Sequence, residues 1–159
     1  MNYQVSFEFS IDSADEKIWF AYSLPYTYSM LINFIKAIED IQNQPEHKTN
    51  NMIYKREVIG KSLSGVEIPL ITITDFSENN KRKRTIIMCS RMHPGESHAS
   101  WIIHGLIRHL LSEHPKSVEL RKRVVFKIIP MMNPDGVIIG NYRTTLAGCD
   151  MNRTFGESS

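Results

Sequence analysis

Cysteine is scarce in this sequence, and long apolar runs are missing from it. Two cysteines, Cys89 and Cys149, are too few for a disulfide framework and suit a reducing compartment. No apolar stretch approaches the length of a membrane span. The N-terminus lacks a basic segment followed by an apolar run, so it does not look like a signal peptide. We therefore expect a cytoplasmic protein with no membrane partner.

A strong charge of one sign is missing too. The formal net charge is +2 and the isoelectric point is about 8.5, which is too mild to indicate a nucleic-acid partner. Hydrophobic residues make up 42% of the chain and charged residues 23%, as in ordinary globular domains. The 159 residues are enough to bury the core of one such domain.

The first part of the chain predicts two strands and then a helix. Polar and apolar residues alternate over residues 3–11, and residues 18–24 are mostly apolar, so we predict two strands that pair as a hairpin or share a sheet. From Tyr28 onward the apolar residues follow helical spacing, with Thr27 or Ser29 as the N-cap.

More strands follow. Residues 54–74 predict two strands joined by a turn at Gly65, with a bulge at Gly60. Residues 85–90 form a short β-branched run, which predicts a strand buried on both faces. Residues 124–132 predict another strand.

An apolar stripe predicts a helix between the last two strands. It extends from Ala99 to Leu111 and ends at His114 and Pro115, while the "NPDG" of residues 133–136 predicts a turn after the final strand. Strand, helix and strand in this order indicate an α/β fold with a mixed, largely parallel sheet and helices on its faces. In such sheets, sites gather at the carboxyl ends of strands.

Two residues with metal-binding side chains stand at such a strand end. His93 and Glu96 are separated by a proline and a glycine, which allow the chain to turn so that both side chains face one point. Imidazole nitrogen and carboxylate oxygen are good zinc ligands. Glu96 could instead complement the dipole of the following helix, with His93 as a polar loop residue. On this pattern alone, that second interpretation is favoured.

A second polar cluster changes this balance. Arg143, Asn152 and Arg153 lie in glycine-rich loop sequence after the neighbouring strand. Loop arginines are usually solvated surface charges. Beside a metal, however, they could bind a carboxylate and stabilise a developing oxyanion.

Several short motifs, taken together, resemble one family. "PYTYS" (residues 25–29), "HPGE" (93–96), "NPDGV" (133–137), "GNYR" (140–143) and "DMNR" (150–153) are similar, in order and spacing, to the zinc metallocarboxypeptidases, in their cytosolic carboxypeptidase branch. The resemblance implies a partial carboxypeptidase fold in two parts. Residues 1–24 would be the last strands of an N-terminal β-sandwich domain, and residues 25–159 the N-terminal half of the catalytic domain.

The resemblance also implies roles for the candidate residues. His93 and Glu96 would be ligands of one Zn²⁺ ion, Arg143 would polarise the scissile carbonyl, and Asn152 and Arg153 would hold the terminal carboxylate of the substrate. The implied reaction releases C-terminal residues by metal-activated water. The branch is known for removing glutamates from tubulin and other acidic tails, so polyglutamylated tubulin is the implied partner.

The family's third zinc ligand and general base lie further along the chain than Arg153. We therefore expect this sequence to be a piece of a longer protein, with the third protein ligand outside it. Two alternatives stay open: a product that binds acidic C-terminal tails without cleavage, and an interaction module that acts through the basic residues 81–84. We expect Cys89 to be a small buried hydrophobe.

Overall fold

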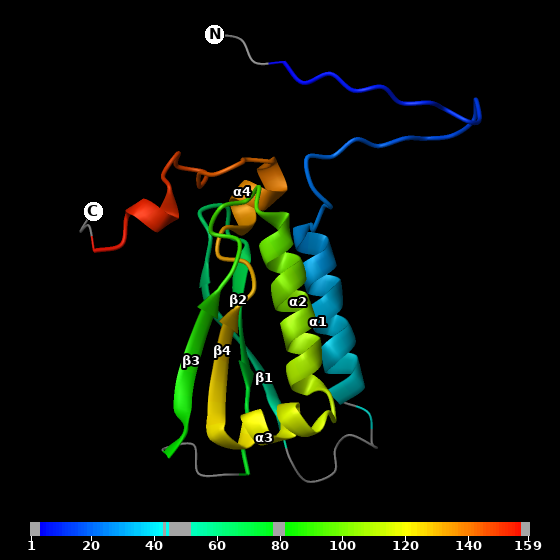
Figure 1. Ribbon diagram of the computed structural model, residues 1–159. Helices are drawn as coiled ribbons and strands as arrows, with labels where there is room; N and C mark the ends of the chain where they lie inside the picture. The colour runs from blue at the N-terminus through cyan, green and yellow to red at the C-terminus, as the bar shows by residue number, and fades with distance from the viewer. Residues whose placement is uncertain (1–3, 43, 45–51, 78–81, 157–159) are drawn as a thin grey trace.

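The computed structural model describes residues 4–42, 44, 52–77 and 82–156, and these form a four-stranded sheet with helices packed against it. Figure 1 shows α1 and α2 side by side against the sheet, with α3 at one end of it and α4 at the other. In chain order the elements are α1 (Tyr28–Gln42), β1 (Tyr54–Lys61), β2 (Glu67–Ile73), β3 (Arg84–Cys89), α2 (Ser97–Leu111), α3 (Pro115–Arg123), β4 (Val124–Ile129), α4 (Pro134–Ile139) and the 3₁₀ turn η2 (Met151–Arg153).

The sheet has the strand order β1-β2-β4-β3. β1 and β4 each pair with β2 in antiparallel orientation, whereas β3 and β4 are parallel and run in step from Arg84 opposite Val124 to Cys89 opposite Ile129. The predicted α/β fold with a mixed sheet is confirmed, although only the β3–β4 pairing is parallel among the described strands. Because β3 and β4 end together, the segments that follow them start side by side.

Apolar side chains from both layers form one core. α1 and α2 each present a stripe at helical spacing to the central strands. The buried side chains include Leu31, Ile35 and Ile38 of α1, Ile103, Ile107 and Leu110 of α2, Ile71 and Ile73 of β2, and Phe126 and Ile128 of β4. Thr27 caps α1, since its Oγ1 accepts a hydrogen bond of 3.1 Å from the amide of Met30. Within the described residues, no helix has the length and apolar content needed to cross a membrane.

The predicted hairpin between β1 and β2 is confirmed. Gly65 lies in its turn with φ of 84°, in the left-handed region that glycine tolerates best. The pairing register shifts between Val58 and Gly60, which is the expected bulge.

The prediction that residues 85–90 form a strand buried on both faces is wrong in its second part. The strand is present as β3, but Ile86 is 43% exposed, Ile87 is 66% exposed, and Cys89 is exposed as well. β3 lies at the edge of the described sheet and pairs only with β4 there. Its β-branched composition indicated a strand correctly, but burial depends on what packs over it.

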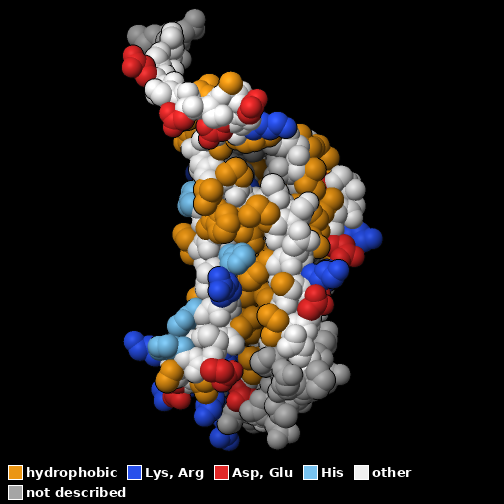
Figure 2. Space-filling view, turned by 90° about the vertical axis from the view of Figure 1, so that its right-hand side faces the viewer, with side chains coloured by type: hydrophobic (Ala, Val, Ile, Leu, Met, Phe, Trp, Pro, Cys, Tyr) orange, Lys and Arg blue, Asp and Glu red, His pale blue; other side chains and the backbone are white. Residues whose placement is uncertain are grey.

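Residues 4–24, which we call the arm, contain neither of the two strands predicted for them. Figures 1 and 2 show most of the arm projecting from the body, while its last residues contact the body: Oγ of Ser97 donates to the carbonyl of Leu24 at 2.7 Å. Its two halves do approach each other, because Phe20 packs against Phe7 and Phe9 with ring centroids 5.3 and 5.5 Å apart. Within the described residues no strand pairs with the arm, and without a partner its alternating pattern forms no ladder. Whether it belongs to a separate β domain stays a prediction.

Two short helices were not predicted. Pro115 does not only end the preceding helical pattern but starts α3, and His114 caps it by accepting a hydrogen bond of 3.2 Å from the amide of Lys116. Similarly, the "NPDG" segment starts α4, with Asn133 as its N-cap and Pro134 in its first turn. Proline fits the first turn of a helix because its missing N–H would be unpaired there anyway.

Candidate active site and metal centre

His93 and Glu96 face each other across the loop between β3 and α2. His93 Nδ1 lies 3.0 Å from Glu96 Oε1. His93 is 8% exposed, whereas the Glu96 side chain is 43% exposed and reaches the surface. Glu96 is the N-cap residue of α2, yet its side chain accepts no hydrogen bond from a helix amide. Its carboxylate is directed to the imidazole instead.

Asp150 lies on the other side of His93. Its Oδ1 is 3.0 Å from His93 Nε2, and its Oδ2 accepts a hydrogen bond of 2.7 Å from Nε of Arg143. The amide of Asn152 donates to Oδ1 at 2.9 Å. Partial burial pushes the pKa of Asp150 up, but the hydrogen bonds from His93, Asn152 and Arg143 outweigh it and hold this pKa below its usual range. Asp150 is therefore a carboxylate that orients the imidazole and the guanidinium together.

Sequence reasoning missed Asp150, although it stands in the "DMNR" segment that was singled out for Asn152 and Arg153. An aspartate in a polar loop is ordinary by itself. The only signal in the sequence was its place two residues before Asn152, and its contact with His93 spans 57 residues of chain.

The geometry of His93 and Glu96 fits a zinc ion. Tetrahedral zinc holds nitrogen and oxygen ligands at roughly 2.0–2.2 Å, which places two such atoms roughly 3.4 Å apart, close to the 3.0 Å found here. When Nε2 carries the proton donated to Asp150, Nδ1 presents a lone pair toward the Glu96 carboxylate. Two electron-pair donors that face each other suit a cation between them. A carboxylate behind a ligating histidine is the usual support in metal sites.

The described residues supply two such ligands and not three. They contain no group of three or more His, Cys, Asp or Glu side chains placed to hold a metal ion. Asp150 touches the far nitrogen of the imidazole, so it supports the pair rather than adding to it.

The ligand loop, residues 91–96, is anchored by the segment after β4. Asn133 is 3% exposed, and its Nδ2 donates to the carbonyls of Met92 and Thr144, each at 3.2 Å. The amide of Gly95 donates to the carbonyl of Tyr142 at 2.7 Å. Gly95 also lies against the ring of Tyr142, so that a Cβ at this position would overlap it. The loops after the two parallel strands therefore hold each other in place.

The three polar residues predicted for substrate binding have different surroundings. Arg143 is joined to His93 through Asp150, and its side chain is 43% exposed. Asn152 and Arg153 lie exposed in η2, where Nη1 of Arg153 donates to the Asn152 carbonyl at 3.2 Å. Among the described residues, no ion pair joins Arg153 to a carboxylate. The structure thus brings His93, Glu96 and Arg143 together and leaves Asn152 and Arg153 open to solvent.

The basic residues proposed for an interaction module are partly engaged in the fold. Nζ of Lys83 donates to Thr74 Oγ1 and to the carbonyl of Arg121, both at 3.0 Å. Residue 81 lies outside the described residues. Lys83 is thereby used to satisfy backbone carbonyls, which weakens this alternative.

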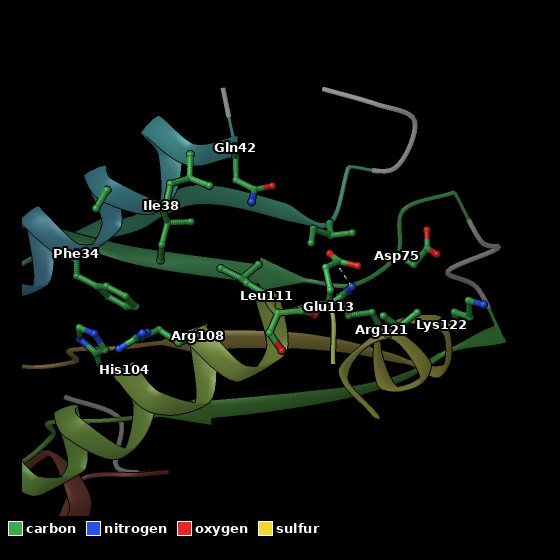
Figure 3. A pocket seen from close by; sticks show the side chains of 15 residues that line it. Phe34, Ile38, Gln42, Asp75, His104, Arg108, Leu111, Glu113, Arg121 and Lys122 are labelled. Atoms are coloured by element: carbon green, nitrogen blue, oxygen red, sulfur yellow. Dashed lines mark hydrogen bonds and ion pairs between the residues drawn. The ribbon is translucent and has the colours of Figure 1, made fainter. Parts of the chain in front are cut away.

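A groove of about 1010 Å³ lies away from the ligand loop, between α1, α2 and α3 (Figure 3). Phe34, His104 and Arg108 line one end of it, and Asp75 and Lys122 the other. None of the candidate ligands or substrate-binding residues borders this groove, so its size does not make it the active site.

Comparison with known proteins shows which family the chain resembles. The family model described as "Zinc carboxypeptidase" matches residues 43–159. Cytosolic carboxypeptidase 1 of Homo sapiens is 36% identical over 99% of this chain and 13% of its own length, and cytosolic carboxypeptidase 6 of Mus musculus is 40% identical over 96% and 27%. Among solved structures, a metallo-carboxypeptidase from Burkholderia cenocepacia is 30% identical with a TM-score of 0.72, and the match covers 85% of this chain and 34% of that one.

These matches cover most of this chain but a minor share of each relative. The chain spans about an eighth to a quarter of the length of these two curated relatives. The family model covers well over half of the chain, and the solved structure shares its fold. On these grounds the chain belongs to the zinc carboxypeptidase family.

Proposed function

We propose that the protein is a zinc-dependent carboxypeptidase that releases residues from the C-terminal ends of peptide tails, with His93 and Glu96 as two of its zinc ligands. The observation that carries the proposal is the 3.0 Å approach of His93 Nδ1 to Glu96 Oε1, in a loop supported from behind by Asp150. This arrangement has the donor chemistry and spacing that zinc needs. The remaining ligand is assigned to a part of the protein outside this chain.

We assign some residues of this chain to substrate binding and others to stabilising the charge that develops during the reaction. A bound zinc ion supplies a nucleophile from water at neutral pH and polarises the scissile carbonyl. Arg143 is held at Nε by Asp150, while its Nη groups donate to no acceptor among the described residues. Those N–H groups are assigned to the carbonyl oxygen as it becomes an oxyanion.

Asn152 and Arg153 are assigned to the terminal carboxylate of the substrate. A free C-terminus is planar, and a guanidinium can bind it through two parallel hydrogen bonds. Both side chains are exposed, and Asp150 holds the first residues of η2 through the Asn152 amide. The recognition of a chain end is what separates an exopeptidase from an endopeptidase.

For the substrate we propose C-terminal glutamates on acidic protein tails of the tubulin type, and for the compartment the cytosol. Support comes from the sequence resemblance and from relatives that are named cytosolic carboxypeptidases. The basis for glutamate selection is assigned to residues outside this chain.

The ligand assignment is tested in the whole protein with His93→Ala and Glu96→Ala. Each variant is expected to lose bound zinc and to lose hydrolysis of a peptide that ends in glutamate, while its unfolding midpoint remains measurable. His98→Ala is the matched control, because His98 is an exposed histidine two residues past Glu96. Full zinc content and activity in either ligand variant would refute the assignment.

Substitutions of Arg143 and Arg153 are expected to change different kinetic parameters. Arg143→Ala should lower kcat by on the order of a hundredfold, because it removes an oxyanion donor. Arg153→Ala should mainly raise KM, because its contact with the carboxylate exists before and during the reaction. Equal effects of both variants on kcat and KM would contradict the division of roles.

A second candidate is binding of acidic tails without cleavage, and the presence of only two ligands among the described residues favours it. It predicts that calorimetry detects binding of a glutamate-ended peptide, that Arg153→Ala weakens this binding, and that added zinc brings no hydrolysis. Zinc-dependent release of glutamate by the whole protein would exclude this candidate.

A further inference from the structure

Arg91 is a buried arginine at the start of the ligand loop. It is 5% exposed, and with φ of 54° it is the one non-glycine residue with positive φ in the described part of the chain. The left-handed conformation costs a non-glycine residue roughly 1–2 kcal/mol. Burying a guanidinium is also costly, and burial lowers the pKa of Arg91. Two unfavourable features at one residue call for a compensating interaction.

That compensation comes from four hydrogen bonds to uncharged acceptors. Nε and Nη2 both donate to the carbonyl of Pro94, at 3.0 and 2.7 Å. Nη1 donates to the carbonyl of Tyr26, just before α1, and to Oγ of Ser100 in α2, each at 2.9 Å. No carboxylate among the described residues pairs with this guanidinium. Arg91 therefore ties the ligand loop to the entry of both long helices.

The Pro94–Gly95 peptide is the unit that Arg91 holds. Its carbonyl accepts the two hydrogen bonds from Arg91, and its N–H donates to the Tyr142 carbonyl at 2.7 Å. Both polar atoms of this peptide are thus fixed, one from each side. The peptide lies between His93 and Glu96, so its orientation sets the angle between their side chains.

We infer that Arg91 is a positioning residue for the zinc ligands, which fixes the Pro94–Gly95 peptide so that His93 and Glu96 meet at one point. This inference rests on the proposed function. A hydrophobic side chain would fill the same space at lower cost if Arg91 only packed. Neither its charge nor its fork geometry is needed for packing, but both are needed to hold three acceptors at once.

The test compares two buried arginines in the whole protein. Arg91→Met removes the guanidinium at the start of α2. Arg121→Met is the control: Arg121 is 4% exposed and donates to the carbonyls of Leu110 and Ser112 at the other end of α2. Both variants should lower the midpoint of thermal unfolding. Zinc affinity, measured by competition with a chelator, should fall about 10–100-fold in Arg91→Met and stay within about twofold in Arg121→Met.

A measurement on the metal-free protein tests whether Arg91 orders the ligand loop independently of zinc binding. In the protein stripped of metal, hydrogen exchange of a peptide that covers residues 91–97 should be faster in Arg91→Met than in the wild type and unchanged in Arg121→Met. If Arg91→Met does not fold, Arg91→Lys decides the question. Lysine keeps the charge but lacks the planar fork, so zinc affinity should fall at least threefold.

The possible results distinguish a failure of the positioning role of Arg91 from a failure of the proposed function. Wild-type zinc affinity and unchanged exchange in the folded Arg91 variant would overturn the positioning role and leave the proposed function intact. Equal losses of zinc affinity in Arg91→Met and Arg121→Met would also overturn it, because the loss would then follow general destabilisation. A wild-type protein that binds no zinc would overturn the proposed function itself.

Discussion

His93 Nε2 and Asp150 Oδ1 lie 3.0 Å apart, although 57 residues separate the two positions in the chain. This contact joins the loop after β3 to the segment that carries Arg143, Asn152 and Arg153. Because Oδ2 of Asp150 also accepts from Arg143, one carboxylate sets the relative position of the candidate metal ligand and the candidate oxyanion donor.

Asp150→Asn is expected to weaken zinc binding about 10–100-fold, as is typical when the support of a ligating histidine is changed. Asparagine can still accept a hydrogen bond but carries no charge to hold the imidazole and the guanidinium together. Competition with a chelator in the whole protein measures the effect. Asp40→Asn, at an exposed aspartate of α1, is the control and should leave the affinity unchanged. Equal zinc affinities of the wild type and Asp150→Asn would show that Asp150 does not support the zinc ligands.

Gly95→Ala should destabilise the protein by about 1–3 kcal/mol, the usual range for overpacking. The added Cβ would lie 2.9 Å from the Tyr142 carbonyl oxygen and closer still to atoms of its ring. Gly105→Ala is the contrasting variant, because Gly105 is exposed within α2 and nothing lies within 4 Å of its added Cβ. It should stabilise the helix by roughly 0.5–1 kcal/mol. Urea unfolding of both variants would reveal opposite signs, and a shared sign would contradict the close packing at Gly95.

The side chain of Asn133 both caps α4 and anchors the ligand loop, and substitutions at this position can distinguish the two contributions to stability. Its Oδ1 accepts from the amide of Gly136 at 3.0 Å, while Nδ2 donates to Met92 and Thr144. Asn133→Ser and Asn133→Asp both keep a capping oxygen, but the aspartate places a charge against two carbonyl oxygens. Each buried group left unpaired costs about 1–3 kcal/mol, so unfolding free energies should fall in the order wild type, Ser, Asp. An aspartate variant as stable as the wild type would show that the two carbonyl contacts contribute nothing.

Asp135 predicts a pH dependence of stability. It is 4% exposed and accepts hydrogen bonds from the hydroxyl of Ser62 at 2.6 Å and the amide of Ser64 at 3.1 Å. Burial raises its pKa, but hydrogen bonds from Ser62, Ser64 and Leu63 outweigh it and hold the pKa below the ordinary value. A lowered folded-state pKa gives stability that is present above the unfolded pKa of about 3.9 and lost as pH falls through the folded value.

Asp135→Asn should therefore lower the unfolding midpoint at pH 7 and have less effect at pH 3. The measurement is the difference in midpoint between the wild type and the variant from pH 7 to pH 3. A difference that stays constant over this range would mean that the ionised carboxylate contributes no stability.

Local patterns predicted most of the fold. Helical spacing from Tyr28 indicated α1, and the turn at Gly65 indicated the β1–β2 hairpin. Exposure could not be predicted for Ile87, because it depends on which elements cover β3. The start of α3 was missed because Pro115 is compatible both with ending one helix and with beginning another.

The candidate site, too, was predicted only where its residues are close together in the sequence. His93 and Glu96 are three residues apart, so their spacing was visible in the sequence, and their role stays a prediction. Asp150 and Arg91 were missed because their partners are remote in sequence or are backbone carbonyls. A carbonyl that accepts from Arg91, such as that of Tyr26, leaves no trace in residue identity.

The hydrogen bonds around the ligand loop determine when it can take its final shape during synthesis. Asn133, Tyr142 and Asp150 all leave the ribosome after His93, the last of them 57 residues later. At about 5–20 residues per second, roughly 3–11 s pass between the appearance of the imidazole and that of its carboxylate partner. The proposed binding of zinc is therefore expected to follow the synthesis of this segment and not to begin when the two ligands first appear.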